Sequence, residues 1–259
     1  MKVVILAGGM GSRINEESRF RPKPMIEIGD RPILWHIMKL YSFYGFQEFI
    51  ICCGYKGHFI KDYFLHYYMH QTDSTFELGK SRVRAHISMA EPWKVTLVNT
   101  GLHTKTAGRI LGIREYIGED ENFMLTYGDG VSDVDISALL DFHWRQGKIA
   151  TLTTTQPAGR FGALKLAPDG RIERFKEKAR KDQSWVNAGF MVLNREIFKY
   201  LGDGSQMLED APFETLVKEG ELAAYKHNGF WSPMDTVPDR EYLEGLWESG
   251  KAPWKVWED

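Results

Sequence analysis

One stretch decides the fold of this chain: Leu6-Ala7-Gly8-Gly9-Met10-Gly11-Ser12-Arg13. It follows Lys2–Ala7, a run of Val, Ile and Leu that predicts a buried strand. Glycines at this position let the backbone approach a phosphate closely, and successive N–H groups form an anion-binding concavity. The stretch therefore predicts a phosphate-binding loop, with a ligand-free turn between strand and helix as the alternative.

Beyond this loop, strand-like and helical patterns alternate. The predicted strands after Lys2–Ala7 are Glu48–Cys53, Phe123–Tyr127 and Thr151–Thr155. The predicted helices are Pro32–Tyr44, His58–His70, Thr106–Ile117 and Asp135–Gly147. This alternation predicts an α/β fold, with a Rossmann-like mixed, mostly parallel sheet flanked by helices.

Two stretches depart from the alternation. Thr72–Thr100 is polar and extended, which predicts a hairpin-like β excursion from the sheet. Ala163–Phe175 holds Pro168-Asp169-Gly170 between two short strand-like runs, which predicts a turn. We expect a single domain over residues 1–259, with 72–100 as an inserted excursion.

Composition excludes several classes of protein. The 259 residues include 33 Lys and Arg and 35 Asp and Glu, so the formal charge of −2 predicts no nucleic-acid partner. No apolar run approaches the roughly 20 residues of a membrane span, so no membrane partner is expected. Cys52 and Cys53 are adjacent and point to opposite faces of a strand, which disfavours a disulfide and predicts a cytoplasmic location.

The spacing of the glycines excludes two common phosphate loops. A dinucleotide fingerprint that begins at Gly9 would need glycine where Ile14 stands, which disfavours a dehydrogenase. A Walker A loop needs Gly-Lys-Ser/Thr, whereas this loop continues as Gly11-Ser12-Arg13.

A lysine between two prolines follows the loop, in Arg21-Pro22-Lys23-Pro24-Met25. Because each proline fixes its own φ and restricts the residue before it, Lys23 is expected to lie on a stiff, extended segment. On its own this pattern indicates a surface loop. Together with the glycine loop it indicates a cation aimed at a phosphate.

Two carboxylates are candidate metal ligands. Asp129 follows a predicted strand, at the sheet edge where α/β folds bind ligands. Asp235 lies among aromatic residues and prolines. Together, the carboxylates of Asp129 and Asp235 suit Mg²⁺. Alternatively, Asp235 caps a helix or accepts a backbone N–H, and Asp129 alone holds the ion. Asp133 and Asp135 are interpreted as helix caps before Ile136–Leu140.

The combined motifs resemble the sugar-1-phosphate nucleotidylyltransferases. The signature of that family is similar to the glycine loop followed by Pro22-Lys23-Pro24-Met25. Further matching stretches are Tyr127-Gly128-Asp129, Phe161-Gly162-Ala163, Phe175-Lys176-Glu177-Lys178, Asn187-Ala188-Gly189-Phe190 and Trp231-Ser232-Pro233-Met234-Asp235-Thr236. Stretches such as Ile50–Gly57, Glu91-Pro92-Trp93 and Tyr242–Glu248 resemble the branch that transfers cytidylyl groups.

The resemblance implies a role for each matching residue. The implied catalytic residues are Arg13, Lys23, Asp129 and Asp235, and the implied Mg²⁺ ligands are Asp129 and Asp235. The implied nucleotide contacts are Leu6, Ala7, Gly8, Gly9, Met10, Gly11, Ser12, Arg13, Lys23, Thr104, Arg109, Gly128 and Asp129. The implied sugar-phosphate contacts are Gly162, Glu177, Lys178 and Asn187. Ala179 stands where the family pattern usually has proline, which removes a backbone restraint beside Lys178.

The same resemblance implies the reaction and the assembly. The expected reaction joins CTP and α-D-glucose 1-phosphate to give CDP-glucose and pyrophosphate. The alternatives are a related enzyme that uses UTP or dTTP and, more remotely, a non-catalytic sugar-nucleotide sensor. A homo-oligomer is expected, with a hexamer favoured and with the excursion as a contact between subunits.

Overall fold

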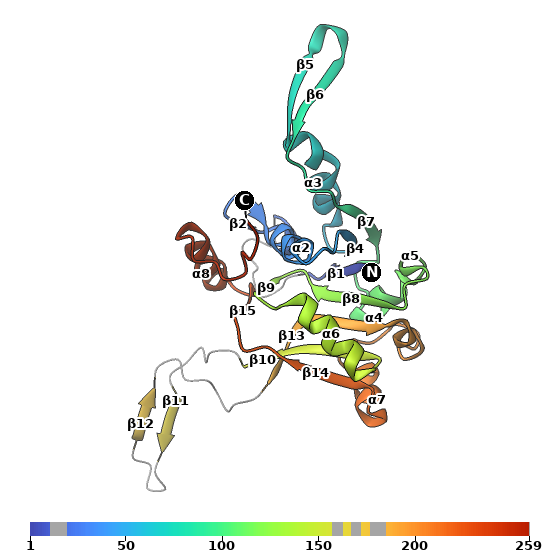
Figure 1. Cartoon of the computed structure of the whole chain (residues 1–259), viewed down its shortest axis with the longest axis vertical. Coiled ribbons are helices and arrows are strands. Elements are labelled where there is room, and N and C mark those ends of the chain that lie inside the picture. The colour runs from blue at the N-terminus through green and yellow to red at the C-terminus, as the bar shows by residue number, and fades with distance from the viewer. Residues whose placement is uncertain (11–19, 157–162, 167–171, 177–184, 259) are drawn as a thin grey trace.

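The computed structural model describes residues 1–10, 20–156, 163–166, 172–176 and 185–258. A seven-stranded sheet forms its centre, with the order β14-β10-β13-β8-β1-β4-β7 (Figure 1). Its strands are β1 (Val3–Ala7), β4 (Glu48–Cys53), β7 (Lys94–Asn99), β8 (Asn122–Tyr127), β10 (Ala150–Thr155), β13 (Val186–Asn194) and β14 (Leu222–Lys226). Only β13 runs antiparallel to its neighbours within this sheet, which confirms the predicted mixed, mostly parallel arrangement.

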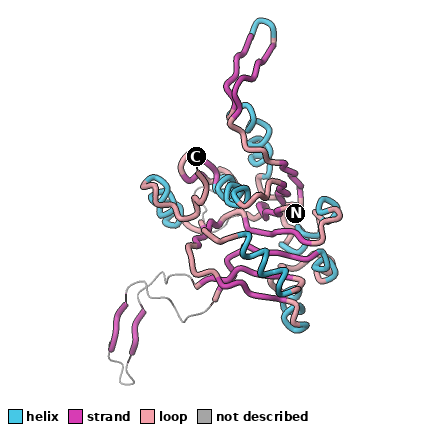
Figure 2. Tube along the Cα trace, viewed as in Figure 1, coloured by secondary structure: helices cyan, strands magenta, loops and turns pink. Residues whose placement is uncertain are grey.

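Helices cover both faces of the sheet because its central strands are apolar on both sides. Val3 and Ile5 of β1 face one core cluster, whereas Val4 and Leu6 face the other. One face is covered by α2 (Ile33–Phe43), α3 (Gly57–His70), α6 (Ile136–Gln146) and α8 (Val237–Glu248). The other face is covered by α4 (Thr106–Leu111), α5 (Arg114–Ile117), α7 (Ala211–Glu219) and the 3-10 turn η3 (Arg195–Lys199). Figure 2 shows these helices on both sides of the strands.

Two predicted elements differ from the structure. The predicted helix Thr106–Ile117 is divided into α4 and α5, because α4 ends at Gly112, a residue with low helix propensity, and Ile113 leaves helical geometry. The predicted excursion Thr72–Thr100 was too long. Its last part, Lys94–Asn99, is strand β7, which pairs in parallel with β4 at one edge of the main sheet.

The excursion itself is a two-stranded hairpin of β5 (Thr72–Glu77) and β6 (Arg82–Ser88), joined by the 3-10 turn η2 (Leu78–Lys80). It projects away from the main sheet beyond α3 (Figure 1). Every residue of β6 is exposed, and the hairpin and its exit present large apolar side chains to solvent. These side chains are Phe76, Leu78, Val83, Ile87 and Met89.

Smaller ladders complete the fold. The antiparallel pairs are β2 (Glu27–Ile28) with β3 (Arg31–Pro32), β9 (Gly130–Ser132) with β15 (Trp231–Pro233), and β11 (Ala163–Leu166) with β12 (Ile172–Lys176). The last pair bears out the predicted strand-like runs around the turn at residues 168–170, which itself lies outside the described residues.

A cluster of tryptophans packs residues 247–257 against α2. Trp254 is fully buried, and its indole N–H donates to Nδ1 of His36 (3.3 Å), while Nε2 of His36 donates to the carbonyl of Ile28 (2.9 Å). Trp247 and Trp257 contact the same imidazole edge-on or tilted. These tryptophans therefore anchor residues 247–257 to the core.

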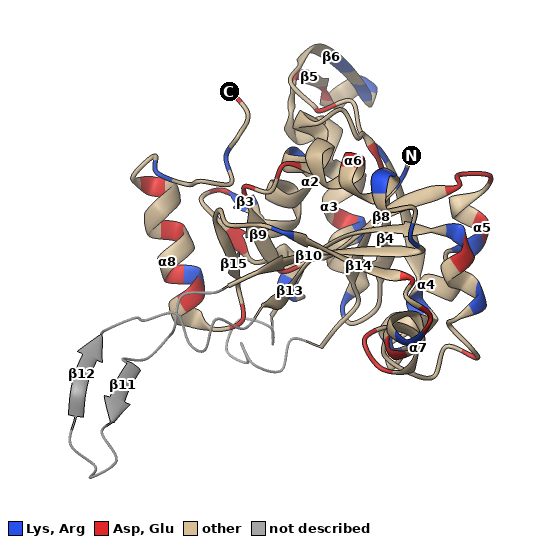
Figure 3. Cartoon of the chain, turned by 60° about the horizontal axis from the view of Figure 1, so that its bottom comes forward, with Lys and Arg blue, Asp and Glu red and all other residues tan. Residues whose placement is uncertain are grey.

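The charged side chains do not segregate by sign. Lys and Arg are interspersed with Asp and Glu over the described elements, as Figure 3 shows. No helix in the described part of the chain combines the length and the apolar character that crossing a membrane requires.

Candidate active site

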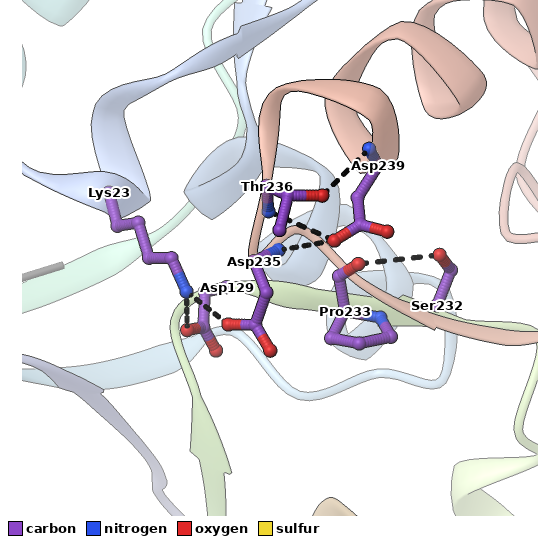
Figure 4. A network of polar contacts seen from close by, with 7 residues as sticks. All are labelled: Lys23, Asp129, Ser232, Pro233, Asp235, Thr236 and Asp239. Carbon is purple, nitrogen blue, oxygen red and sulfur yellow. Dashed lines mark hydrogen bonds and ion pairs between the residues drawn. The ribbon is translucent and has the colours of Figure 1, made fainter. Parts of the chain in front are cut away.

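Lys23 lies at the centre of the site. It begins the 3-10 turn η1 (Lys23–Met25), which follows Pro22 in extended conformation, and its side chain is only 10% exposed. Its Nζ lies 2.8 Å from Oδ2 of Asp129 and 2.5 Å from Oδ1 of Asp235 (Figure 4). The structure thus brings together three of the four residues predicted to be catalytic, although 106 residues separate the two carboxylates (235 − 129).

The β9–β15 ladder brings the two carboxylates side by side. Asp129 follows β8 and immediately precedes β9, whereas Asp235 follows β15 by two residues. The two strands are antiparallel, with Gly130 opposite Pro233, and the N–H of Met234 donates to the carbonyl of Asp129 (2.7 Å). Asp129 therefore lies at the carboxyl end of a central strand, as predicted.

The start of α8 is capped by residues other than Asp235. Thr236 is the N-cap of that helix, and it forms a reciprocal capping box with Asp239. Asp239 also accepts the N–H of Asp235 (3.1 Å). Thr236 and Asp239 thus cap the helix, and the carboxylate of Asp235 contacts Lys23 (Figure 4).

The charges of this cluster suit a divalent cation. Burial by itself lowers the pKa of Lys23, but the charges and hydrogen bonds of Asp129 and Asp235 outweigh that effect and raise it. One ammonium between two carboxylates leaves a net negative charge. Mg²⁺ is usually held by one or two carboxylates, with phosphate oxygens and water as its other ligands. Within the described residues, no group of three or more His, Cys, Asp and Glu side chains forms a metal cage.

A buried arginine supports the glycine loop from beneath. Nη2 of Arg109 donates to the carbonyl of Gly8 (2.9 Å), and Nη1 donates to the carbonyl of Gly101 (2.8 Å) and the hydroxyl of Thr100 (2.7 Å). A Cβ at Gly8 would lie 2.1 Å from Nη1, so any other residue there would displace the guanidinium from these contacts. Burial lowers the pKa of Arg109. Arg109 therefore joins the ends of β1 and β7 at the predicted nucleotide loop.

Thr104 lines an open depression of about 510 Å³ next to this loop. The other lining residues are His103, Lys105, Gly108, Leu111, Asp203, Gly204 and Ser205.

The start of β13 lies next to the ladder. The indole N–H of Trp231 in β15 donates to the carbonyl of Ala188 (2.8 Å), and the Asn187 side chain accepts the N–H of Gly189 (2.9 Å). The ring of Tyr127 lies 2.6 Å from where a Cβ at Gly189 would be, which requires glycine at this position, where φ is +87°. Trp231 is a contact that the sequence analysis did not identify as part of the site.

The two remaining aspartates differ in role. Asp135 caps α6, and its carboxylate accepts the N–H of Ala138 (2.8 Å), as predicted. The prediction that Asp133 is a helix cap was wrong, because its carboxylate accepts the N–H of Phe230 (2.7 Å) and contacts Nε2 of His227 (2.9 Å). Both aspartates stand shortly before α6, so their position in the sequence could not show which of them caps the helix.

Several predicted site residues lie outside the described residues. They are Gly11, Ser12, Arg13, Gly162, Glu177 and Lys178. The other predicted nucleotide contacts lie in the described residues. The last two residues of β1 are Leu6 and Ala7, and the strand is followed by Gly8, Gly9 and Met10. Gly128 directly precedes Asp129.

Comparisons with known proteins identify the family and the fold. The family model described as nucleotidyl transferase matches residues 2–259. A glucose-1-phosphate cytidylyltransferase from Salmonella typhimurium is 53% identical over 258 residues, covering 100% of both chains. A probable glucose-1-phosphate cytidylyltransferase from Bacillus subtilis is 44% identical over 258 residues, covering 99% of this chain and 100% of its own. The crystal structure of HddC from Yersinia pseudotuberculosis is 21% identical and shares the fold with a TM-score of 0.69, covering 95% of this chain and 99% of that one.

Proposed function

The chain belongs to the nucleotidyl transferase family, and from that premise we propose that it transfers the cytidylyl group of CTP to α-D-glucose 1-phosphate. The products are CDP-glucose and pyrophosphate. The observation that carries the proposal is the convergence of Lys23, Asp129 and Asp235 in a chain that matches relatives named for this reaction along its whole length.

The reaction needs charge neutralisation more than proton transfer. A phosphate oxygen of glucose 1-phosphate attacks the α-phosphorus of CTP, and the bond from that phosphorus to the oxygen bridging to the β-phosphate breaks. The nucleophile is already an anion at neutral pH, so no general base is required. Catalysis then depends on aligning two anions and cancelling their repulsion.

Lys23 supplies a positive charge to the α-phosphate. Lys23 is the first residue of a short turn and lies between two prolines. Its backbone therefore loses little conformational freedom when the ammonium binds a phosphate. The same ammonium pairs with both carboxylates. Arg13 would stabilise the pyrophosphate that leaves, and the N–H groups of the glycine loop would hold the triphosphate. Arg109 fixes the carbonyl side of that loop, and Thr104 contacts the nucleotide beside it.

Asp129 and Asp235 would hold Mg²⁺, which would neutralise phosphate charge when bound. What supports this assignment is that both carboxylates lie within hydrogen-bond distance of one cationic atom, Nζ of Lys23. Asp129 also lies between Gly128 and Gly130, so neither of its neighbours in the chain carries a side chain that could block a phosphate.

The sugar phosphate is proposed to bind near the start of β13. Asn187 lies there, and Trp231 joins this segment to the strand that leads to Asp235. Gly162, Glu177 and Lys178 would complete the contacts: the carboxylate and amide would bind hydroxyl groups, and the ammonium would bind phosphate.

The exposed hairpin β5–β6 supports the proposal of a homo-oligomer, with a hexamer favoured. Its apolar side chains have no core to enter within the described chain, and a second copy of the chain would cover them. A cytoplasmic location is part of the same proposal, in keeping with the free thiols of Cys52 and Cys53.

Pyrophosphate release across a grid of nucleotides and sugar phosphates tests the function. We expect the highest kcat/KM for CTP with glucose 1-phosphate. A preference for UTP or dTTP would replace the cytidylyl assignment with the related pyrophosphorylase. Binding of CDP-glucose without pyrophosphate release from any pair would indicate a sugar-nucleotide sensor.

A further inference from the structure

A second polar cluster holds the far end of the β9–β15 ladder, away from Lys23. At the Lys23 end, the N–H of Met234 donates to the carbonyl of Asp129. At the far end, the N–H of Asp133 donates to the carbonyl of Phe230 (3.2 Å), and the carboxylate of Asp133 accepts the N–H of Phe230 (2.7 Å). Asp133 therefore binds the opposite strand through both its backbone and its side chain.

His227 joins this cluster to the main sheet. Its Nε2 lies 2.9 Å from Oδ1 of Asp133, 3.1 Å from the carbonyl of Phe230 and 3.3 Å from the hydroxyl of Ser132. Because a carbonyl oxygen only accepts, the contact with Phe230 requires the proton on Nε2 of His227. Its backbone N–H donates to the carbonyl of Thr154 in β10 (2.8 Å). The side chain of His227 is 10% exposed, so these contacts form in a largely dry environment.

Two further contacts fix the segment between β14 and β15. A Cβ at Gly229 would lie 2.4 Å from Oδ1 of Asp133 and 2.6 Å from Cε1 of His227, so any other residue there would displace these side chains. The ring of Phe230 stacks on the buried Trp254, with centroids 5.6 Å apart. The start of β15 is thus held by polar contacts on one side and by the core on the other.

The ladder requires such an anchor because it is short. Each strand has three residues, and an isolated pair of this length is marginal in water. A shift of one residue would turn every side chain of β15 to the other face and displace Asp235 from Asp129. The observed register places Trp231 opposite Ser132 and Pro233 opposite Gly130.

We propose that Asp133 and His227 are positioning residues that set the register of β9 and β15 and so hold Asp235 beside Asp129. This inference rests on the proposed function, in which those two carboxylates bind the metal. Neither Asp133 nor His227 touches Lys23, and their effect passes through the backbone of the ladder.

Mn²⁺ binding, followed by water-proton relaxation, tests the proposal in the full chain without requiring turnover. Asp133→Ala is expected to raise the half-saturating Mn²⁺ concentration about tenfold or more, as losses of orienting contacts at metal sites do. Asp133→Asn keeps an oxygen that accepts the N–H of Phe230, so its half-saturating Mn²⁺ concentration should rise less than that of Asp133→Ala. Gly229→Ala keeps both side chains but places a methyl group against the two of them, so it should disturb the contact between Asp133 and His227 and weaken Mn²⁺ binding in the same direction.

Asp135→Ala is the matched control, because Asp135 lies two residues away and caps α6 without touching β15. It should lower the melting temperature and leave Mn²⁺ binding and the Mg²⁺ dependence of kcat unchanged. If Asp133→Ala and Gly229→Ala bind Mn²⁺ as tightly as Asp135→Ala does, Asp133 is only a stabilising residue and the proposal is overturned.

Asp235→Asn separates this failure from a failure of the proposed metal site. If Asp235→Asn binds Mn²⁺ as the natural chain does, the assignment of the metal ligands is wrong and the positioning role falls with it. If Asp235→Asn loses Mn²⁺ while Asp133→Ala retains it, only the positioning role is overturned.

Discussion

Acidification should destabilise this protein through one buried histidine. His36 is fully buried against Trp247 and Trp254, and burial lowers its pKa from 6.5 to about 4. Its Nδ1 accepts from Trp254, so protonation of that atom would break the bond and leave a charge in an aromatic cage. The unfolded chain binds this proton more readily than the folded one, so stability falls as the pH falls from about 6.5 to about 4.

The size of the effect follows from the two pKa values. Each unit of difference corresponds to about 1.4 kcal/mol, so the full loss is about 3 kcal/mol once the pH is below 4. Between about pH 7.5 and about pH 5, the loss from His36 alone is about 2 kcal/mol. That is a large part of the 5–15 kcal/mol that is typical for a folded domain.

Urea unfolding of the natural chain and of His36→Gln, at both pH values, measures the difference. His36→Gln should be less stable at neutral pH, but its stability should fall by about 2 kcal/mol less on acidification. His143, whose pKa burial also lowers, is present in both proteins, so its contribution cancels. An equal loss of unfolding free energy in the two proteins would refute the reasoning.

Other perturbations test the site and the assembly. Lys23→Ala should lower kcat for pyrophosphate release on the order of 10²–10³-fold, because a charge beside the α-phosphate is lost; unchanged turnover would contradict that role. Asp129→Asn and Asp235→Asn should each abolish Mg²⁺-dependent turnover while circular dichroism shows an intact fold, and normal turnover in Asp235→Asn would leave Asp129 as the only protein ligand. Arg109→Lys should raise the KM for CTP more than it lowers kcat, since a single ammonium cannot replace the contacts to Gly8 and Gly101; an unchanged KM would show that the loop does not need them. Light scattering at micromolar concentration should show an oligomer that is lost when β5–β6 is replaced by a short turn, and a monomeric natural chain would disprove the proposed contact.

Much of the sheet could be predicted because its strands are apolar on both faces. The run Val3–Ala7 has no polar residue to suggest another structure, and it forms an interior strand between β8 and β4. β7 was harder to place, since Lys94–Asn99 alternates polar and apolar residues and resembles the hairpin that precedes it. Sequence periodicity describes a strand, but it does not identify the strand with which it pairs.

The site was predictable where the motif contains the functional atoms themselves. Lys23 stands between two prolines, which restrict the backbone, and Asp129 stands between two glycines, which free it. A lysine can bind phosphate and an aspartate can bind a metal ion, so the residue types themselves indicate the chemistry. Asp133 offered no such signal, because an aspartate before a helix has the same local pattern whether it caps that helix or binds a strand 97 residues away. Its partner, Phe230, is adjacent only in the folded chain.

The burial of Trp254 has a consequence for how this protein is made. Trp254 packs in the same core cluster as Val3 and Ile5 of β1, so a surface formed first on the ribosome is completed by a residue synthesised long afterwards. Until then the nascent chain exposes apolar surface of the kind that chaperones bind. Premature termination before residue 254 should therefore yield an aggregation-prone fragment rather than a shorter enzyme.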